Sequence, residues 1–100
     1  MNESNYVAPA RPEHLTRRGI FYINAPFLHD PKSAEILARC VFAKTVIVRA
    51  EYLFSSDRFV YEAYSPLFEI VSDPVLSPEY EWIFGTKENG SVVAAVAKKK

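Results

Sequence analysis

Residues 30–54, DPKSAEILARCVFAKTVIVRAEYLF, contain a helix start followed by a strand, and this stretch decides the fold class. The Asp30-Pro31 pair is typical of a helix N-terminus, because the carboxylate accepts hydrogen bonds from free backbone N–H groups and proline lacks only an N–H that would be unpaired. Apolar residues then recur at helical spacing, at Ala34, Leu37, Ala38 and Val41. We therefore predict an amphipathic helix near residues 31–44, with Leu37 and Val41 in the core.

The end of this stretch changes to a period of two, which is typical of a half-buried strand. Between residues 46 and 54, the even-numbered positions are all apolar or aromatic, whereas the odd-numbered positions are Ile47, Arg49, Glu51 and Leu53. Residues 55–58, SSDR, have turn composition, and residues 59–64 alternate again. The sequence therefore predicts a β-hairpin over residues 46–64.

Three further strands are predicted on either side of this region. Residues 20–23 are all β-formers with both faces apolar, which favours an interior position in a sheet. Residues 80–84 and 91–97 flank an Asn-Gly pair, a strong hairpin signal. Residues 67–71, between prolines, fit either a helical turn or a short strand. About twenty residues separate the first two strands, enough for a crossover that would make them parallel.

The predicted fold class is α+β: a mainly antiparallel sheet of four to five strands with one amphipathic helix packed on one face. An irregular arm at residues 1–18 precedes a single domain at 19–97, and a basic tail follows at 98–100. One helix covers only one face of such a sheet, so the other face is expected to be open.

The composition is that of an ordinary soluble chain, with 49% hydrophobic and 24% charged residues in a length of 100. The formal net charge is zero, which gives no general attraction to nucleic acid or to membranes and little electrostatic protection against self-association. No secretory signal and no apolar run of membrane-spanning length are present, so a cytoplasmic location is expected. A single cysteine excludes an internal disulfide.

Four residues could suggest catalysis or metal binding: His14, His29, Asp30 and Cys40. None has the spacing of a metal-binding motif, and the three glycines are too scattered to form a phosphate-binding loop. Asp30 is needed as a helix cap, and Cys40 lies beside the apolar stripe as a small core residue. We therefore expect no enzyme activity, no metal and no cofactor.

Residues 51–90 are both acidic and aromatic. Eight acidic residues against two basic ones give a net charge of −6, and nine of the fourteen aromatic residues lie here. A solvent-exposed outer face of the sheet would account for part of this acidic pattern. However, apolar side chains occupy the same alternating positions as the carboxylates and would lie on the same strand faces. An apolar patch with a polar rim is typical of interfaces. The predicted protein-binding residues are Glu51, Glu62, Tyr64, Glu81 and Ile83.

The expected function is therefore a non-catalytic protein-binding module, whose partner is another protein with a basic surface or a second copy of the chain. The alternative is a single-stranded nucleic-acid binder that uses Arg11, Arg17, Arg18 and the terminal lysines beside sheet aromatics, although the strand carboxylates would repel phosphates.

The segments RRGIFYINAP, EYLFSSDRFVYEAYSPLF and PEYEW give the chain the general character of small bacteriophage accessory proteins. Proteins that it resembles in this way bind and block a host factor. The resemblance implies an inhibitor in the host cytoplasm that occupies a basic surface, such as that of a nucleic-acid-handling complex. It identifies no functional residue.

Overall fold

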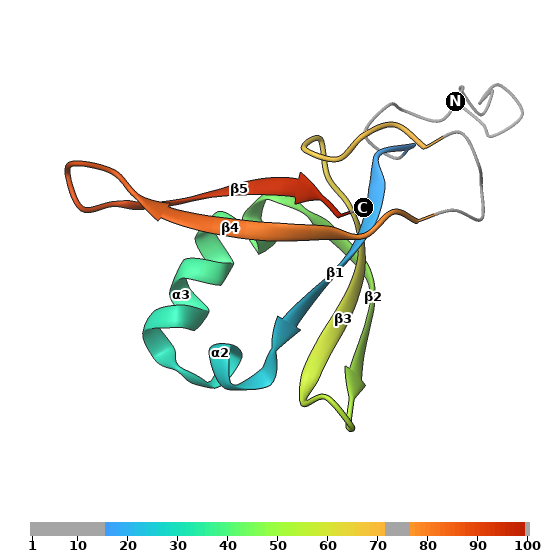
Figure 1. The fold of residues 1–100 in the computed structure, drawn as a ribbon, viewed down its shortest axis with the longest axis horizontal. Coiled ribbons are helices and arrows are strands. Elements are labelled where there is room, and N and C mark those ends of the chain that lie inside the picture. The colour runs from blue at the N-terminus through green and yellow to red at the C-terminus, as the bar shows by residue number, and fades with distance from the viewer. Residues whose placement is uncertain (1–15, 72–76, 100) are drawn as a thin grey trace, which may run out of the picture.

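The computed structural model describes residues 16–71 and 77–99 and shows an α+β fold (Figure 1). Its elements, in chain order, are β1 (Arg18–Asn24), α2 (Ala25–His29), α3 (Pro31–Cys40), the 3₁₀ helix η2 (Phe42–Lys44), β2 (Val46–Leu53), β3 (Arg58–Tyr64), β4 (Tyr80–Thr86) and β5 (Val92–Lys98). The α+β class and the five predicted strands are confirmed. The short helix α2 was not predicted, and most of the predicted arm lies outside the described residues.

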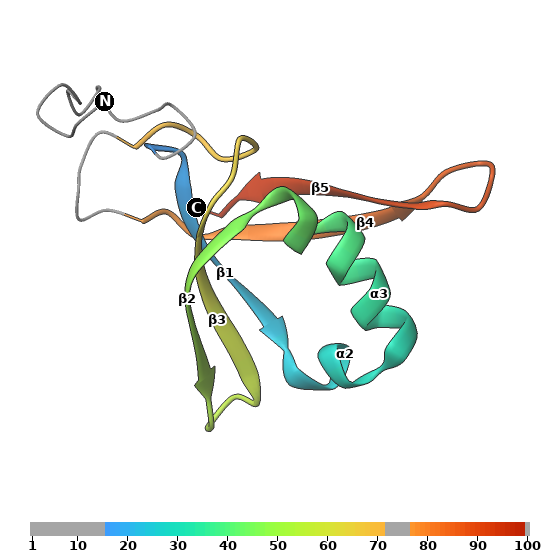
Figure 2. The same cartoon turned by 180° about the vertical axis from the view of Figure 1, so that it is seen from behind.

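The strands form two sheets rather than one. A three-stranded sheet has the order β1-β3-β2, a two-stranded sheet pairs β4 with β5, and every pairing within them is antiparallel. A single parallel bridge between Ile20 and Glu79 joins β1 to β4. The prediction of one four- to five-stranded sheet is therefore wrong. Pairing stops after this bridge because the two strands diverge: β1 runs on to Asn24 and leads into α2, whereas β4 runs past α3 in a different direction (Figures 1 and 2).

The prediction that β1 is interior to its sheet is also wrong, because β1 is an edge strand. Its second apolar face is instead half-buried by the chain around Ser77 and Pro78, where the Ile20 N–H donates to the Pro78 carbonyl at 2.8 Å. The predicted parallel orientation of β1 and β2 is confirmed, since both strands are antiparallel to β3, which lies between them.

The cap and the buried face of α3 largely follow the sequence pattern. The Asp30 carboxylate accepts hydrogen bonds from the Ser33 backbone N–H (3.0 Å) and hydroxyl (2.8 Å), and these bonds hold the pKa of Asp30 below its usual value. The helix ends at Cys40, earlier than predicted, and η2 follows. Leu37 and Val41 are buried as predicted, but Ala38 is exposed and Cys40 takes its place in the core.

The core is largely aromatic and lies between α3, the β1 end of the three-stranded sheet and the β4–β5 hairpin. Phe21 stacks on Tyr61 at 5.4 Å between ring centroids and meets the edge of Trp82 at 5.7 Å. Phe68 stacks on Tyr80 at 4.4 Å. Phe68 belongs to residues 65–71, which form no strand but begin with a turn, in which the Phe68 N–H donates to the Ser65 carbonyl at 3.1 Å. This core brings β1 and β4 side by side at one end only.

A candidate binding groove between β1 and β4

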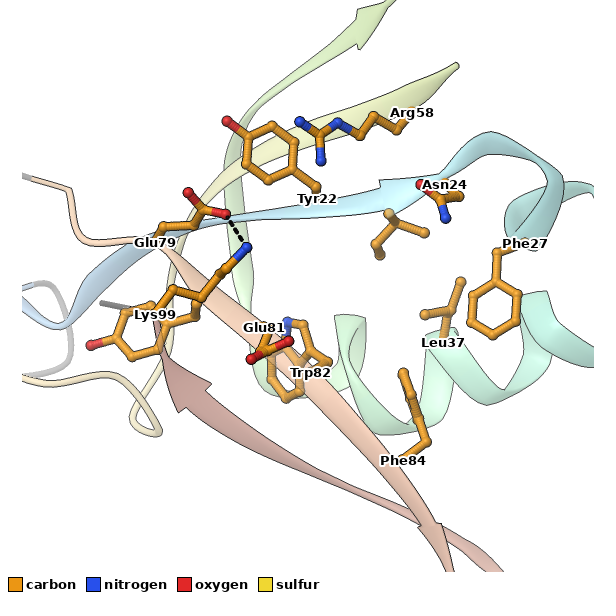
Figure 3. Close-up of a pocket in the computed structure, with 12 residues that line it drawn as sticks. Tyr22, Asn24, Phe27, Leu37, Arg58, Glu79, Glu81, Trp82, Phe84 and Lys99 are labelled. Carbon is orange, nitrogen blue, oxygen red and sulfur yellow. Dashed lines mark ion pairs between the residues drawn. The ribbon is translucent and has the colours of Figure 1, made fainter. Parts of the chain in front are cut away.

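A wedge-shaped groove opens where β1 and β4 separate beyond the Ile20–Glu79 bridge. It has a volume of about 360 Å³ and is drawn in Figure 3. Its lining comes from β1 and α2, from α3 and β3, and from the segment around β4. The lining residues are Tyr22, Ile23, Asn24, Phe27, Leu37, Arg58, Glu79, Tyr80, Glu81, Trp82, Phe84 and Lys99.

One wall of the groove is the open edge of β1. The Ala25 N–H donates to the Asp57 carbonyl and the Ser65 N–H donates to the Arg17 carbonyl, both at 2.9 Å. The odd-numbered residues of β1 therefore exchange their backbone bonds with β3. Because backbone groups alternate between the two edges of a strand, the even-numbered residues point the other way. Tyr22 thus directs its N–H and C=O toward the groove.

The opposite wall is the open edge of β4. The Lys99 N–H donates to the Glu79 carbonyl and the Lys87 N–H donates to the Ser91 carbonyl, both at 2.8 Å. The odd-numbered residues of this hairpin arm therefore bond across to β5, and the same alternation directs the backbone groups of Trp82 and Phe84 toward the groove. Two strand edges with free backbone groups thus face one another across it.

The floor of the groove is apolar. Buried Leu37 and Ile23 are among its lining residues. Figure 3 shows Leu37 on α3 and Phe84 on the β4 side. Phe27 of α2 meets Phe84 edge-on, with 6.3 Å between ring centroids, and the Phe27 ring remains exposed. An apolar floor between polar edges can bury a side chain of an incoming chain while its backbone is hydrogen-bonded.

The indole of Trp82 adds a free donor. Its Nε1 is a buried nitrogen that finds no hydrogen-bond partner among the described residues. In Figure 3 this nitrogen lies on the groove side of the ring. Leaving a buried N–H unpaired is costly, so a ligand that shifts the indole far enough to supply an acceptor would remove this penalty.

The charged residues of the groove are paired, with one exception. Glu79 forms an ion pair with Lys99 at 3.2 Å, and the Arg58 guanidinium lies 4.0 Å from the centre of the Tyr22 ring. Glu81 is exposed at the rim and makes no hydrogen bond or ion pair with any described residue. The contact with the Tyr22 ring does not neutralise Arg58, so the charges of the two cations and two carboxylates of the groove sum to zero. What the groove offers is one carboxylate, that of Glu81, without an ion pair among the described residues.

The five residues predicted for protein binding do not share one sheet. Glu51, Glu62 and Tyr64 lie on the outer face of the three-stranded sheet, away from the core. Glu81 and Ile83 lie on the outer face of β4, and only Glu81 borders the groove. The separation follows from the split of the expected single sheet into two.

The outer face of the three-stranded sheet is also less acidic than its sequence indicated. Arg49 is paired with Glu62 across β2 and β3, and Arg58 faces Leu53 on the same side, so these arginines balance Glu51 and Glu62. The Glu62 carboxylate is held by the Ser77 hydroxyl at 3.1 Å and by Arg49 at 3.9 Å. Glu51 remains exposed without an ion pair among the described residues.

The residues considered in the sequence for nucleic-acid binding, catalysis or metal binding include Arg17, Arg18 and Cys40, which the structure describes. Arg17 donates to the Phe68 carbonyl at 2.8 Å, and Arg18 is only 6% exposed, so it does not present its charge to phosphates. Arg11 and His14 lie outside the described residues. Cys40 is buried, as predicted, with its Sγ 3.6 Å from the Val92 carbonyl oxygen. No metal-binding group of His, Cys, Asp and Glu occurs in the described part of the chain.

Sequence reasoning missed most of the groove. Tyr22 and Trp82 fall in predicted strands with no binding role assigned to them, and Asn24 and Phe27 carry no functional prediction. No local signal identifies them, because the groove depends on where two strands 60 residues apart in the sequence stop pairing.

Comparisons with protein-family models, with curated proteins and with solved structures find no match to this chain. Within residues 16–71 and 77–99, no helix is long and apolar enough to cross a membrane.

Proposed function

We propose that the chain is a non-catalytic protein-binding module that holds an extended segment of another protein in the groove between β1 and β4. The observation that carries this proposal is that two strand edges with free backbone groups, at Tyr22 and at Trp82 and Phe84, face one groove. The lining of this groove combines polar residues with the apolar side chains of Phe27, Leu37 and Phe84. Adding a strand to an exposed sheet edge is a common mode of peptide recognition, in which main-chain hydrogen bonds supply affinity and side-chain pockets supply specificity.

The shape of the groove favours pairing with one edge at a time. Because β1 and β4 diverge from the Ile20–Glu79 bridge, an added strand cannot keep the spacing of about 4.8 Å to both along its length. Beyond the bridge, β4 offers the longer open edge, because β4 continues to Thr86 whereas β1 ends at Asn24. We propose that the segment pairs with Trp82 and Phe84 and places an apolar side chain over Leu37.

The polar groups define the chemistry of the segment. A backbone carbonyl would accept the indole N–H of Trp82, which supports an extended peptide over a purely apolar ligand. The unpaired carboxylate of Glu81 favours a Lys or Arg side chain at the rim. This retains the expected basic partner, but it assigns the contact to Glu81 at a groove rather than to a whole acidic face.

The proposal is tested with short synthetic peptides that alternate Val and Lys, compared with peptides that alternate Val and Glu. Trp82 is the only tryptophan of the chain, so its fluorescence reports occupancy of the groove directly. We expect saturable binding of the Val-Lys peptide, with a change in emission, and at least several-fold weaker binding of the Val-Glu peptide.

Two charge-reversal variants of the β4–β5 hairpin, one at the groove and one away from it, test the role of Glu81. Glu81→Lys should weaken binding of the Val-Lys peptide and slow its association, because the rim charge is reversed. Glu88→Lys makes the same charge change in the turn between β4 and β5, away from the groove, and should leave binding unchanged. Failure of both peptides to bind, or equal losses in the two variants, would contradict the proposal.

A further inference from the structure

A further exposed strand edge lies along β2, at the other edge of the three-stranded sheet from β1. This strand is the outer strand of its sheet and pairs only with β3. Six of its eight residues are exposed, whereas no residue of β3 is. Long exposed apolar edge strands are sites at which one chain pairs with another.

The inner face of this strand is uncovered as well. Ala50 and Tyr52 lie opposite Tyr61 and Phe59 on the face that forms the core elsewhere, yet Tyr52 is 43% exposed. The β2–β3 hairpin extends away from α3 and from the β4–β5 hairpin, so neither covers this end (Figures 1 and 2). The Tyr52 hydroxyl donates to the Asp57 carboxylate at 2.6 Å, which fixes the ring beside the open edge.

The backbone of β2 offers free groups at its centre. Since the odd-numbered residues of β3 bond to β1, its even-numbered residues bond to β2, and these lie opposite Arg49, Glu51 and Leu53. Ala50 and Tyr52 therefore direct their N–H and C=O groups away from β3. The bulge between Ile47 and Arg49 leaves Val48 without a register partner on β3.

The sequence of this edge complements itself. In an antiparallel pair centred on Ala50, Arg49 lies opposite Glu51 of the second copy, and Glu51 lies opposite Arg49 of the second copy. Tyr52 then faces Val48, so apolar groups also meet. Moving the centre by two residues, to Val48 or to Tyr52, removes both charge pairs. One register is therefore favoured by the charges.

We propose that two copies of this chain pair through their β2 strands about a two-fold axis at Ala50, joining the two three-stranded sheets into one of six strands. The two-fold axis makes each contact occur twice, as in other isologous dimers. Arg49 is available because its side chain is 66% exposed, and Glu51 is exposed without an ion pair among the described residues. The net charge of zero adds no long-range repulsion between copies.

The first test is sedimentation velocity of the full chain over a range of concentrations, with two charge variants. Glu51→Arg and Arg49→Glu each place two like-charged pairs across the axis, so each should raise the dimer dissociation constant by roughly 10- to 100-fold. Mixing the two variants should restore dimers, because only the heterodimer places opposite charges together. Glu35→Arg, on the exposed side of α3, should leave the dimer unchanged.

The second test uses Ala50→Pro. Proline removes the N–H that points to the open edge, and this N–H makes no bond to β3, so the monomer's sheet keeps its hydrogen bonds. Circular dichroism should remain close to that of the parent chain, while dimerisation is lost.

A parent chain that stays monomeric at every concentration would overturn the proposal, as would charge variants that form no heterodimer when mixed. The result is independent of the groove, because peptide binding at β4 uses none of these residues.

Discussion

The two ends of the three-stranded sheet differ in burial although their sequences alternate in the same way. At the β1 edge, Phe21 is fully buried beneath α3 and the β4–β5 hairpin, whereas at the β2 edge Tyr52, on the same face, is 43% exposed, and Phe54, in the turn that follows β2, is 88% exposed. The difference arises because a single helix and a two-stranded hairpin cover only part of one sheet face (Figure 1). Alternation therefore tells which face of a strand is apolar, but not whether anything covers that face.

The molecule thus has a covered part, around β1, α3 and the β4–β5 hairpin, that holds the fold together. Its uncovered part, along β2, is exposed to solvent. Aromatic burial is the main source of stability where rings pack on one another. An exposed ring contributes little to the folded state of the isolated chain. The uncovered rings and edges are therefore where we propose that partners bind.

The largest expected effect comes from truncating one phenylalanine at each end. Phe21→Ala should lower the free energy of unfolding by about 3–5 kcal/mol, because it removes a ring that contacts Tyr61, Phe68 and Trp82. Phe54→Ala should change it by less than about 0.5 kcal/mol in the monomer. Urea denaturation at low protein concentration measures both, and similar losses would show that the two ends are not distinct.

A smaller effect is expected from adding one methyl group in the covered part. A Cβ at Gly19 would lie 2.5 Å from Cδ2 of Tyr80 and 3.2 Å from Cδ2 of Phe68, both in the core. Gly19→Ala should therefore cost about 1–3 kcal/mol through overpacking. Gly85→Ala is the matched control, because a Cβ there has nothing within 4 Å. Gly85→Ala should leave the free energy of unfolding unchanged or raise it slightly. A comparable loss of stability in both variants would show that overpacking against Tyr80 and Phe68 is not the cause.

The smallest effect concerns the cap of α3, the helix that covers one end of the sheet. Because folding lowers the pKa of Asp30, its stabilising contribution is present above the pKa of the unfolded chain and is lost as pH falls through the lower folded value. Asp30→Ala should lower the melting temperature at neutral pH, and the difference from the parent should shrink in acid.

Asp30→Asn is the control for this cap, because an amide oxygen can accept the same hydrogen bond without titrating. Its melting temperature should lie closer to the parent's, and the Asn variant should not show the acid-dependent loss. A deficit of Asp30→Ala that stays constant down to strongly acidic pH would exclude the carboxylate as the cause.

Local structure could be predicted from the sequence wherever one short pattern decides it. The Asp30-Pro31 start of α3, the hairpin turn at Asn89-Gly90 and the burial of Leu37 follow from capping, turn chemistry and helical spacing. The five strands were also found, because each alternates or is rich in β-formers over several residues.

Features that depend on distant pairing could not be predicted in this way. The bulge between Ile47 and Arg49 shifts the parity of β2, so Val46 lies on the face of Tyr64 rather than on that of Ala50. The division into two sheets depends on the single bridge between Ile20 and Glu79. The groove follows from that division, so only Glu81 among the predicted site residues borders it.

The most direct test of this account is amide hydrogen exchange, measured residue by residue at low and at high protein concentration. The N–H of Phe21 should be protected at both, because it lies in the covered part and points to β3. The N–H groups of Ala50 and Tyr52 should exchange rapidly at low concentration and become protected at high concentration, while those of Trp82 and Phe84 stay rapid until a basic extended peptide is added. Protection of Ala50 and Tyr52 at low concentration, or no change with concentration, would contradict the account.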